Sequence, residues 1–248
     1  MDELRGKNAI VTGANRGLGL SFVIKLAEAG CNVWACMRSE SIDFINKAQE
    51  LNNIYNVRIT PVYFDLTSTD EIKEAYKTLC KETKNIDILI NNAGIGHMGF
   101  FQMTKMSDIR TLYEVNLFAP MQLTQYVLRN MQKQGYGRII NVASTAATEI
   151  YEGNSIYGAT KSALIAWTKS LAAETMRYGI TVNAIAPGLV ETRMSEVFEG
   201  KDPQEPLRHT ALGRKINPNE IADIVVELLQ SKMSIINGEV IYIHGGHK

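Results

Sequence analysis

The stretch Thr12–Gly19, which reads TGANRGLG, follows directly on the short apolar run Ala9–Val11. A glycine-punctuated turn between a strand and a helix lets the backbone approach a pyrophosphate, whose charge is met by backbone N–H groups and the dipole of the helix N-terminus. The glycines are spaced GxxxGxG, with three residues between the first two where the common dinucleotide fingerprint has one. The stretch predicts a strand, a phosphate-binding turn and a helix that stops at Gly30; a glycine-rich turn without a ligand is the alternative.

Apolar runs alternate with helical patterns along the rest of the chain. These runs are mostly non-alternating, which is typical of parallel strands that helices cover on both faces. With right-handed crossovers the pattern predicts an α/β, doubly wound (Rossmann) fold: a parallel seven-stranded sheet in a single domain over residues 1–248, with ligands at the carboxyl ends of the strands. The predicted strands are Ala9–Thr12, Val33–Cys36, Arg58–Phe64, Ile86–Ile90, Gly137–Val142, Ile180–Ala186 and Glu239–Ile243.

A pair of chemically useful side chains lies farther along the chain. Tyr157 and Lys161 are four residues apart, so a helix over residues 155–178, with Ser155 as its N-terminal cap, puts them on one face, a turn apart. A tyrosine has an ordinary pKa of about 10 and is a poor acid–base group at neutral pH unless a nearby cation stabilises its phenolate. Lys161 is such a cation; an incidental pair on a solvated helix face is the alternative.

Composition narrows the class of protein. The chain has 248 residues, of which 45% are hydrophobic, so one domain can bury a full core. Its 26 Lys and Arg residues balance 26 Asp and Glu residues, which argues against nucleic acid or an anionic membrane as a partner. No apolar run approaches the roughly 20 residues of a membrane span, and Met1–Arg5 does not begin a signal peptide. We therefore expect a cytoplasmic protein.

Cysteine and histidine usage predicts no metal site. Cys31, Cys36 and Cys80 are odd in number and lack CxxC spacing, which favours reduced core thiols over disulfides or zinc ligands. His244 and His247 are spaced HxxH near the C-terminus, but no third ligand accompanies them.

Taken together, the Thr12–Gly19 turn and the Tyr157-x-x-x-Lys161 pair resemble the classical short-chain dehydrogenase/reductases. The resemblance extends over essentially the whole chain, because further motifs recur in the order expected of that family. In pattern the chain is most similar to the 3-oxoacyl-[acyl-carrier-protein] reductases. The further motifs are Asp65-Leu66, Asn91–Gly94, Asn116, Ser144 after Gly137–Ala143, Pro187-Gly188 with Thr192, and the tail Gly238–Gly246.

The resemblance implies reduction of a carbonyl to a secondary alcohol by reversible hydride transfer from a nicotinamide cofactor. Tyr157 is then the general acid, and Lys161 lowers its pKa and binds the nicotinamide ribose. Ser144 hydrogen-bonds the carbonyl oxygen, and Asn116 anchors a water that links Lys161 to solvent. These roles suit the residue types, since a hydroxyl and an amide both donate and accept whereas an ammonium only donates.

Charge near the second predicted strand indicates NADP(H). Relatives that prefer NAD place an acidic residue at the end of that strand, whereas this chain has Met37 followed by Arg38, and Arg16 is a second cation near the same ribose. Charge-assisted contacts to a 2′-phosphate favour NADP(H), and two solvated arginines are the alternative. Asp65 and Leu66 are expected at the adenine, and Asn91 on the cofactor floor. The implied cofactor-binding residues are Gly13, Asn15, Arg16, Gly17, Leu18, Gly19, Arg38, Asp65, Leu66, Asn92, Ala93, Gly94, Tyr157, Lys161, Pro187, Gly188 and Thr192.

The substrate is less well defined by the sequence. Residues 191–217 correspond to the family's mobile lid, with an ordinary surface loop as the alternative. Where the carrier-docking arginines of the resembled reductases are expected, this chain has Tyr178, next to Arg177, and Gln134-Gly135. A small carbonyl or alcohol and a carrier-bound acyl chain therefore both stay open. A partly apolar pocket, or plain core and lid packing, is indicated by His97, Met98, Phe100, Phe101, Met103, Ile150, Tyr151, Met194 and Phe198.

Two further expectations concern partners and activity. The helices around 107–133 and 157–178 have apolar residues on more than one face, and in the resembled family they pack against a second subunit, so we expect a homodimer or homotetramer. A non-catalytic NADP(H)-binding regulatory or assembly protein is the alternative to an enzyme, but such proteins usually lose the tyrosine or the lysine. The apolar residues in question are Tyr113, Leu117, Met121, Leu123, Tyr126 and Trp167.

Overall fold

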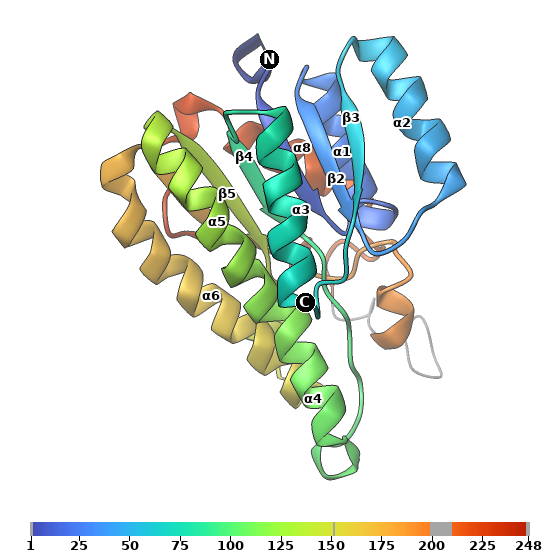
Figure 1. The fold of residues 1–248 in the computed structure, drawn as a ribbon. Coiled ribbons are helices and arrows are strands. Elements are labelled where there is room, and N and C mark those ends of the chain that lie inside the picture. The colour runs from blue at the N-terminus through green and yellow to red at the C-terminus, as the bar shows by residue number, and fades with distance from the viewer. Residues whose placement is uncertain (1, 151, 199–209, 247–248) are drawn as a thin grey trace.

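The computed structural model describes residues 2–150, 152–198 and 210–246. At its centre is a parallel seven-stranded sheet with the strand order β3-β2-β1-β4-β5-β6-β7, as Figure 1 shows. The order reverses at β1, as in a doubly wound fold, so the predicted fold class is confirmed. The strands are β1 (Asn8–Thr12), β2 (Asn32–Met37), β3 (Ile59–Tyr63), β4 (Ile88–Asn91), β5 (Gly137–Val142), β6 (Ile180–Pro187) and β7 (Val240–Ile243).

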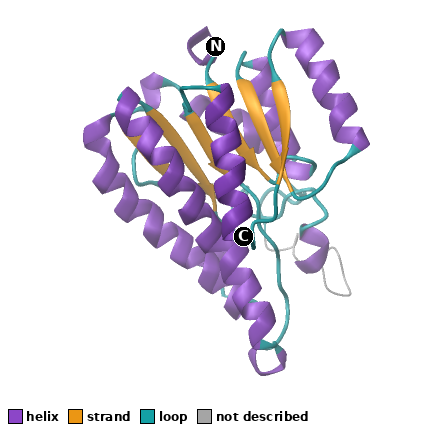
Figure 2. Cartoon of the chain, in the orientation of Figure 1, coloured by secondary structure: helices purple, strands orange, loops and turns teal. Residues whose placement is uncertain are grey.

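Helices cover both faces of the sheet (Figure 2). Helices α1, α2 and α8 contribute to one buried apolar cluster, and α3, α5 and α6 contribute to the other. Successive residues of one strand face opposite clusters: Ala9 and Val11 lie in the first and Ile10 in the second. The helices are α1 (Gly17–Glu28), α2 (Ile42–Tyr55), α3 (Thr69–Glu82), α4 (Met106–Tyr113), α5 (Ala119–Gln134), α6 (Ser155–Thr175) and α8 (Pro218–Leu228).

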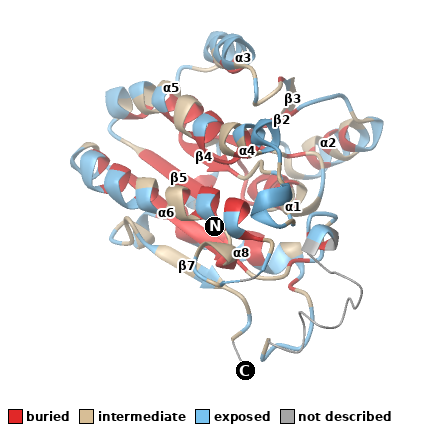
Figure 3. Cartoon of the chain, turned by 90° about the horizontal axis from the view of Figure 1, so that it is seen from below, coloured by how far each residue is buried: buried red, intermediate tan, exposed pale blue. Residues whose placement is uncertain are grey.

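Burial on both faces explains the non-alternating apolar runs in the sequence. Every residue of β5 and of β6 is buried, and Figure 3 shows the buried strands between helices that are each exposed on one side. A strand that packs against helices on both faces needs apolar side chains at odd and even positions alike. Because all seven strands are parallel, the loops that follow them meet at the carboxyl edge of the sheet.

Three local predictions differ from the structure. Ser155 is the first residue of α6 and not its cap; the capping position is Asn154, whose φ of −107° and ψ of 6° are not extended and whose side chain makes no capping bond. Helix α6 ends at Thr175, and a 3₁₀ turn over Met176–Tyr178 completes the predicted span. The fourth strand begins two residues later than predicted, at Ile88.

The helices expected to face a second subunit are in part core. Leu117 and Leu123 are buried within the chain, and Tyr126 stacks on Tyr76 with ring centroids 5.3 Å apart. Trp167 packs partly buried against the cluster of α3, α5 and α6. On these helices the exposed large apolar side chains are Met106, at 57%, and Phe118, at 49%. The sequence pattern alone does not separate such core positions from surface positions, because both recur with helical spacing.

Among the described residues, no helix has the length and apolar character needed to cross a membrane, and no group of three or more His, Cys, Asp or Glu side chains is placed to hold a metal ion. Cys31 and Cys36 are buried and Cys80 is exposed. His247 lies outside the described residues.

Candidate active site

The glycines of the first turn are required by its geometry. Gly13 and Gly17 have φ of 66° and 52°, in the left-handed region that favours glycine. A Cβ on Gly19 would lie 2.0 Å from the carbonyl oxygen of Gly13, so only glycine lets α1 begin this close to the end of β1. Arg16, the capping residue of α1, makes no side-chain capping bond. The turn therefore presents backbone close to the helix N-terminus, as a phosphate site needs.

Asn92 ties this turn to the end of β4. Its backbone N–H and that of Ala93 donate to the Thr12 hydroxyl, each at 3.0 Å, and its side-chain amide donates to the Thr12 carbonyl at 2.8 Å. A Cβ on Gly13 would lie 2.9 Å from the Cα of Ala93. Two of the predicted cofactor segments are thus in direct contact. Thr12 was not predicted as a site residue from the sequence, although its position immediately before the first glycine of the turn indicated that it lies at the site.

The expectation for Asn91 is wrong. Its side-chain amide donates to the Thr124 hydroxyl at 3.1 Å and to the Asn141 side chain at 2.8 Å, inside the layer between the sheet and α5. Neighbouring side chains at a strand end point to opposite faces, so Asn91 and Asn92 cannot both face the cofactor side.

Tyr157 and Lys161 lie in the first two turns of α6, each only 4% exposed. The Lys161 Nζ lies 5.9 Å from the centroid of the Tyr157 ring and donates to the Val142 carbonyl, at the end of β5, at 2.8 Å. Ser144, just after β5, hydrogen-bonds the Tyr157 side chain and also accepts from the backbone N–H of Ala146. The structure therefore brings the three predicted catalytic side chains together at the carboxyl end of β5.

Burial decides the protonation of this pair. It raises the pKa of Tyr157 to about 12, although the hydrogen bond with Ser144 acts in the opposite direction, and it lowers the pKa of Lys161 to about 8. Burial and the hydrogen bond with Ser144 account for the shift of the Tyr157 pKa in the chain alone, so the expectation that Lys161 lowers this pKa stays a prediction. At neutral pH Tyr157 is a neutral donor and Lys161 is still mostly charged.

Asn116 was predicted within a long helix and lies in a π-helical segment, Glu114–Phe118, between α4 and α5. Such segments widen a helix by one residue per turn and occur often at functional sites. The Asn116 amide oxygen accepts from the Ile95 N–H at 2.9 Å, and its nitrogen donates to the Ile95 carbonyl at 3.0 Å and to the Thr160 hydroxyl at 3.2 Å. Asn116 thus joins the loop after β4 to α6; Thr160 was missed from the sequence, although it precedes Lys161.

Gly94 makes this arrangement possible. A Cβ at Gly94 would lie 3.2 Å from the Asn116 amide oxygen and 3.4 Å from the Lys161 Nζ, which places all three residues within a few ångströms of one another. A side chain there would crowd both groups.

The segment after β6 reaches back to the glycine turn. A Cβ on Gly17 would lie 3.0 Å from the Thr192 methyl group, and Gly188 packs against His244 so closely that its Cβ would lie 2.9 Å from that of His244. The two ends of the predicted lid are joined where Val190 pairs with Ile216 in an isolated β-bridge. Residues 199–209 of the predicted lid lie outside the described residues.

The predicted adenosine side of the site is open. Arg16 and Arg38 are exposed, whereas Met37, just before Arg38, is buried. Asp65 accepts from the backbone N–H and the hydroxyl of Thr67, each at 2.8 Å. These bonds, and to a smaller extent the charge of Arg38, hold the pKa of Asp65 below its usual value. Arg38 and Asp65 therefore lie near each other at the ends of β2 and β3.

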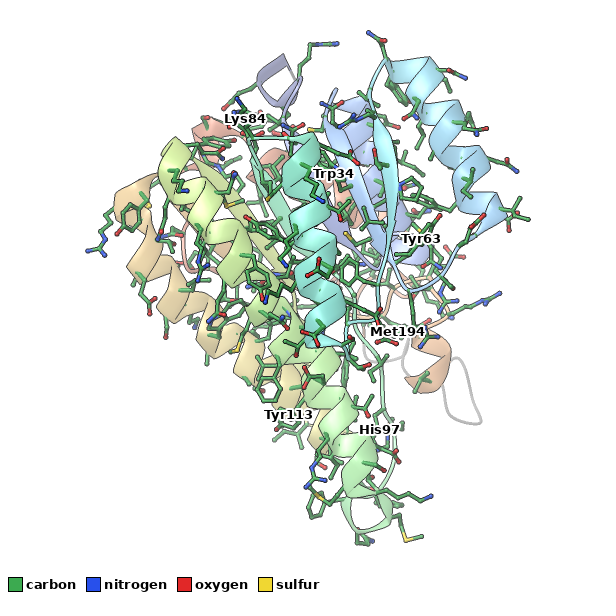
Figure 4. All side chains as sticks on the ribbon, in the orientation of Figure 1. Trp34, Tyr63, Lys84, His97, Tyr113 and Met194 are labelled. Atoms are coloured by element: carbon green, nitrogen blue, oxygen red, sulfur yellow. The ribbon has the colours of Figure 1, made fainter. Side chains whose placement is uncertain are left out.

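The opposite side of the site consists of two loops tied together. The Gly99 N–H, after β4, donates to the Gly153 carbonyl, before α6, at 2.8 Å. His97 lies on the first loop, with its Nε2 3.1 Å from the Thr104 hydroxyl, and Met194 lies on the segment after β6 (Figure 4). Tyr151 and the side chain of Phe198 lie outside the described residues. The predicted apolar side chains that are exposed are Met98, Phe100, Phe101, Met103, Ile150 and Met194.

Comparison with known proteins agrees with this geometry. The family model described as short chain dehydrogenase matches residues 7–202. The chain is 37% identical to the 3-oxoacyl-[acyl-carrier-protein] reductase of Aquifex aeolicus, over 98% of each chain, and 33% identical to that of Escherichia coli, over 97% of each. Among solved structures, L-sorbose reductase from Gluconobacter frateurii complexed with NADPH and L-sorbose has a TM-score of 0.90 at 27% identity, covering 99% of this chain and 98% of that one.

A mutant of a Serratia marcescens short-chain dehydrogenase/reductase has a TM-score of 0.91 at 29% identity, covering 98% of each chain. The match of the family model over most of the chain and the identity to full-length relatives confirm the resemblance first indicated by the two sequence motifs. The chain belongs to the short chain dehydrogenase family.

Proposed function

We propose that this chain reduces a carbonyl to a secondary alcohol, reversibly, with NADP(H) as cofactor. The observation that carries the proposal is the buried Tyr157, hydrogen-bonded to Ser144 and one helical turn from Lys161, at the carboxyl edge of the sheet. The relatives named as reductases support the reaction class, and the NADPH in the L-sorbose reductase complex supports the cofactor.

Each catalytic residue has a distinct part in this mechanism. NADPH, when bound, supplies the hydride that reaches the carbonyl carbon. Tyr157 gives its phenolic proton to the carbonyl oxygen, which the Ser144 hydroxyl also hydrogen-bonds. The ammonium of Lys161 stabilises the phenolate that remains on Tyr157. Asn116 holds the loop after β4 against α6, and its part in returning a proton from solvent stays a prediction.

The glycine turn fits the cofactor's pyrophosphate, because a Cβ at Gly13, Gly17 or Gly19 would fill space that the turn keeps for backbone. Gly94, Gly188 and Thr192, on the neighbouring segments, stay predicted cofactor contacts. The exposed guanidinium groups of Arg16 and Arg38 are available to a 2′-phosphate, and the pairing of two cations with one phosphate favours NADP(H) over NAD(H).

Arg38→Asp is expected to weaken NADPH binding at least 10-fold and NADH binding by less than about 3-fold, because only NADPH carries the 2′-phosphate. A charge-assisted contact stabilises binding by about 1.5–3 kcal/mol, and each 1.4 kcal/mol changes the affinity tenfold. Titration of each cofactor by fluorescence checks the two affinities. The matched control is Arg129→Asp, which makes the same charge change on the exposed face of α5. Equal losses of NADPH and NADH affinity would show that Arg38 does not bind the phosphate.

The rate of carbonyl reduction is expected to fall as pH rises through about 8. Tyr157 keeps its proton until about pH 12, so it is not the group that fails first, whereas Lys161 loses its charge near pH 8 and can then no longer stabilise the phenolate. The measurement is kcat against pH at saturating NADPH and substrate. A rate that stays level to pH 10 would contradict the role given to Lys161.

The substrate is a small carbonyl or alcohol, or an acyl chain on a carrier. The names of the sequence relatives favour the carrier-bound substrate. Arg177 lines an open cavity of about 350 Å³ between α5 and α6, which gives a carrier a cationic contact, but Tyr178 and Gln134-Gly135 stand where docking arginines were expected. This cavity lies away from Tyr157, so it is a candidate docking point and not the reaction site.

We also infer a single domain over residues 1–248, with residues 191–217 as a lid, and assembly into a homodimer or homotetramer. The exposed Phe118, within the first of the two helices that were expected to pair, and the 45% exposed Met176, just after α6 in the second, support assembly through these helices.

Light scattering at micromolar concentration is expected to give a mass of two or four times 27.6 kDa. Phe118→Glu should lower that mass, because a carboxylate on the paired face is desolvated without a partner. A wild-type mass of one chain would contradict the proposed assembly.

A further inference from the structure

Hydrogen bonds between buried polar side chains cross the apolar layer on one side of the sheet. Their middle member is Asn91 on β4, whose amide donates to Thr124 of α5 and to Asn141 of β5. The Asn141 Nδ2 donates in turn to the Thr168 hydroxyl of α6 at 2.8 Å, and that hydroxyl donates to the Leu164 carbonyl at 2.8 Å. Thr124, Asn91, Asn141 and Thr168 are here called the polar network. It joins two strands of the sheet to two of the helices that cover them.

The polar network occupies places that apolar side chains could fill. Thr124, Asn141 and Thr168 have 0% exposure and Asn91 has 2%. Ile139, two residues before Asn141 on the same face of β5, belongs to the apolar cluster of α3, α5 and α6. Hydrogen bonds offset the cost of burying amides and hydroxyls only in part, and the Asn91 amide oxygen has no hydrogen-bond partner among the described residues. Buried polar contacts are best attested where they fix how elements lie relative to one another, so the network indicates a requirement for position.

The end of β5 bonds α6 at the site as well. The Val142 carbonyl, next to Asn141, accepts from Lys161, and Ser144 follows two residues later. Thr168 lies seven residues after Lys161, which is about two helical turns or 10 Å along the same face of α6. The bond between Asn141 and Thr168 is therefore a second directional link between the same strand and the same helix.

Directional bonds resist a movement of α6 that apolar packing tolerates. Leu171 and Ala172 of α6 pack in the apolar cluster, and such contact is non-directional. A hydrogen bond, in contrast, weakens steeply once its distance or angle departs from the optimum. Helix α6 runs without a break through all 21 of its residues, so a shift along its axis at Thr168 is passed on to Lys161 and Tyr157.

We propose that Thr168 is a positioning residue: its hydroxyl, bonded by Asn141, fixes where α6 lies along β5 and thereby the distance between the hydroxyls of Tyr157 and Ser144. Thr168 acts through α6 and not by contact with substrate or cofactor. The inference rests on the proposed carbonyl reduction, in which both hydroxyls bond the carbonyl oxygen. Small movements matter there, because a displacement of about 1 Å can lower a rate about 10²-fold.

The experiment compares substitutions of Thr168 that separate its hydroxyl from its shape. Thr168→Val keeps the branched shape and removes the hydroxyl, so kcat should fall at least about 5-fold, while NADPH affinity should stay within about 3-fold because the glycine turn is untouched. Thr168→Ser keeps the hydroxyl and removes the methyl group, and its kcat should stay within about 2-fold of wild type. The readout is NADPH oxidation at saturating NADPH and substrate. The substrate is the one that wild type reduces fastest among ethyl 3-oxobutanoate, L-sorbose and a carrier-bound 3-oxoacyl chain.

Thr175→Val is the matched control on the same helix. Thr175 is also buried, and its hydroxyl donates to the Leu171 carbonyl at 2.8 Å, just as the Thr168 hydroxyl donates to Leu164. The control therefore removes the same atom and the same bond within α6, but not the bond to Asn141. Its kcat should stay within about 2-fold of wild type.

Thermal unfolding separates positioning from a structural role. Thr168→Val leaves the buried Asn141 amide without its acceptor, so the Tm should fall. The double variant Asn141→Leu/Thr168→Val replaces both partners by apolar groups and leaves the Asn91 amide bonded to Thr124, so the Tm should recover toward wild type. Positioning predicts that kcat stays low in the double variant, whereas a structural role predicts that kcat recovers with the Tm. The double variant also serves if Thr168→Val alone does not fold.

Three results would overturn the inference: a fall in kcat of less than about 5-fold in Thr168→Val, an equal loss in Thr168→Ser or Thr175→Val, or a kcat that recovers in the double variant. An active wild type that loses turnover in Tyr157→Phe but not in Thr168→Val contradicts the inference alone. A wild type that reduces no carbonyl compound contradicts the proposed function, and the inference fails with it. The two failures are therefore distinguishable.

Discussion

Tyr157→Phe is expected to lower turnover at least 100-fold while leaving NADPH affinity and folding nearly unchanged. The substitution removes only the phenolic oxygen, which is the proposed proton donor, and keeps the ring that α6 buries beside β5. Acid catalysis by a positioned side chain is worth about 10²–10⁴-fold. The oxygen also loses its hydrogen bond with Ser144, so a small fall in stability accompanies the loss of activity.

The measurement is steady-state NADPH oxidation with any accepted carbonyl, with NADPH affinity titrated on the same preparation. Tyr55→Phe is the matched control, because it removes a phenolic oxygen at the end of α2, away from the site. A Tyr157→Phe protein that binds NADPH normally and keeps more than about a tenth of wild-type turnover would contradict the proposed mechanism.

Lys161→Met is expected to abolish measurable turnover and weaken NADPH binding, yet to raise the Tm at pH 7. Burial lowers the pKa of Lys161 from an ordinary 10.5 to about 8, so the unfolded chain binds its proton more tightly than the folded chain does. That difference destabilises the folded state by on the order of 3 kcal/mol below about pH 8, and the effect disappears as pH rises from about 8 to 10.5. Methionine fills similar space without a charge, although the Val142 carbonyl loses its donor, a change of about 1 kcal/mol.

Thermal unfolding of wild type and Lys161→Met at pH 7 and near pH 10.5 checks this account. The gain in Tm from the substitution should be largest at pH 7 and should shrink at the higher pH. If Lys161→Met is instead less stable than wild type, and by the same amount at both pH values, Lys161 is a structural residue. Its interactions in the folded chain then fully offset the cost of burying its charge.

The fold was predictable from the sequence because its main signal is local. Parallel strands buried on both faces need continuous apolar runs, and β5 and β6 are buried at every residue, so their limits were predicted to within one residue. The glycine turn was equally clear, since the positive φ of Gly13 and the contact of Gly19 with the Gly13 carbonyl leave no room for another residue type.

The parts of the site that were mispredicted depend on three-dimensional surroundings. Asn91 and Asn92 are adjacent in sequence, yet one is bonded inside the sheet and the other at the glycine turn, because neighbouring side chains at the end of β4 point to opposite faces. The direction of the Tyr157 pKa shift is set by total burial, which no single motif specifies. Nor does any motif reveal that the Asn154 amide oxygen has no hydrogen-bond partner among the described residues, because that depends on every group packed around it.

The most direct test of the central claim is NADPH consumption by wild type with a panel of carbonyl compounds, α-hydroxy ketones and carrier-bound 3-oxoacyl chains included, with the alcohol product quantified. The account predicts that at least one compound is reduced, with one alcohol formed for each NADPH consumed, and that Tyr157→Phe forms it at least about 100-fold more slowly. A wild-type protein that binds NADPH but consumes it with no member of the panel would contradict the claim and favour a non-catalytic NADP(H)-binding protein.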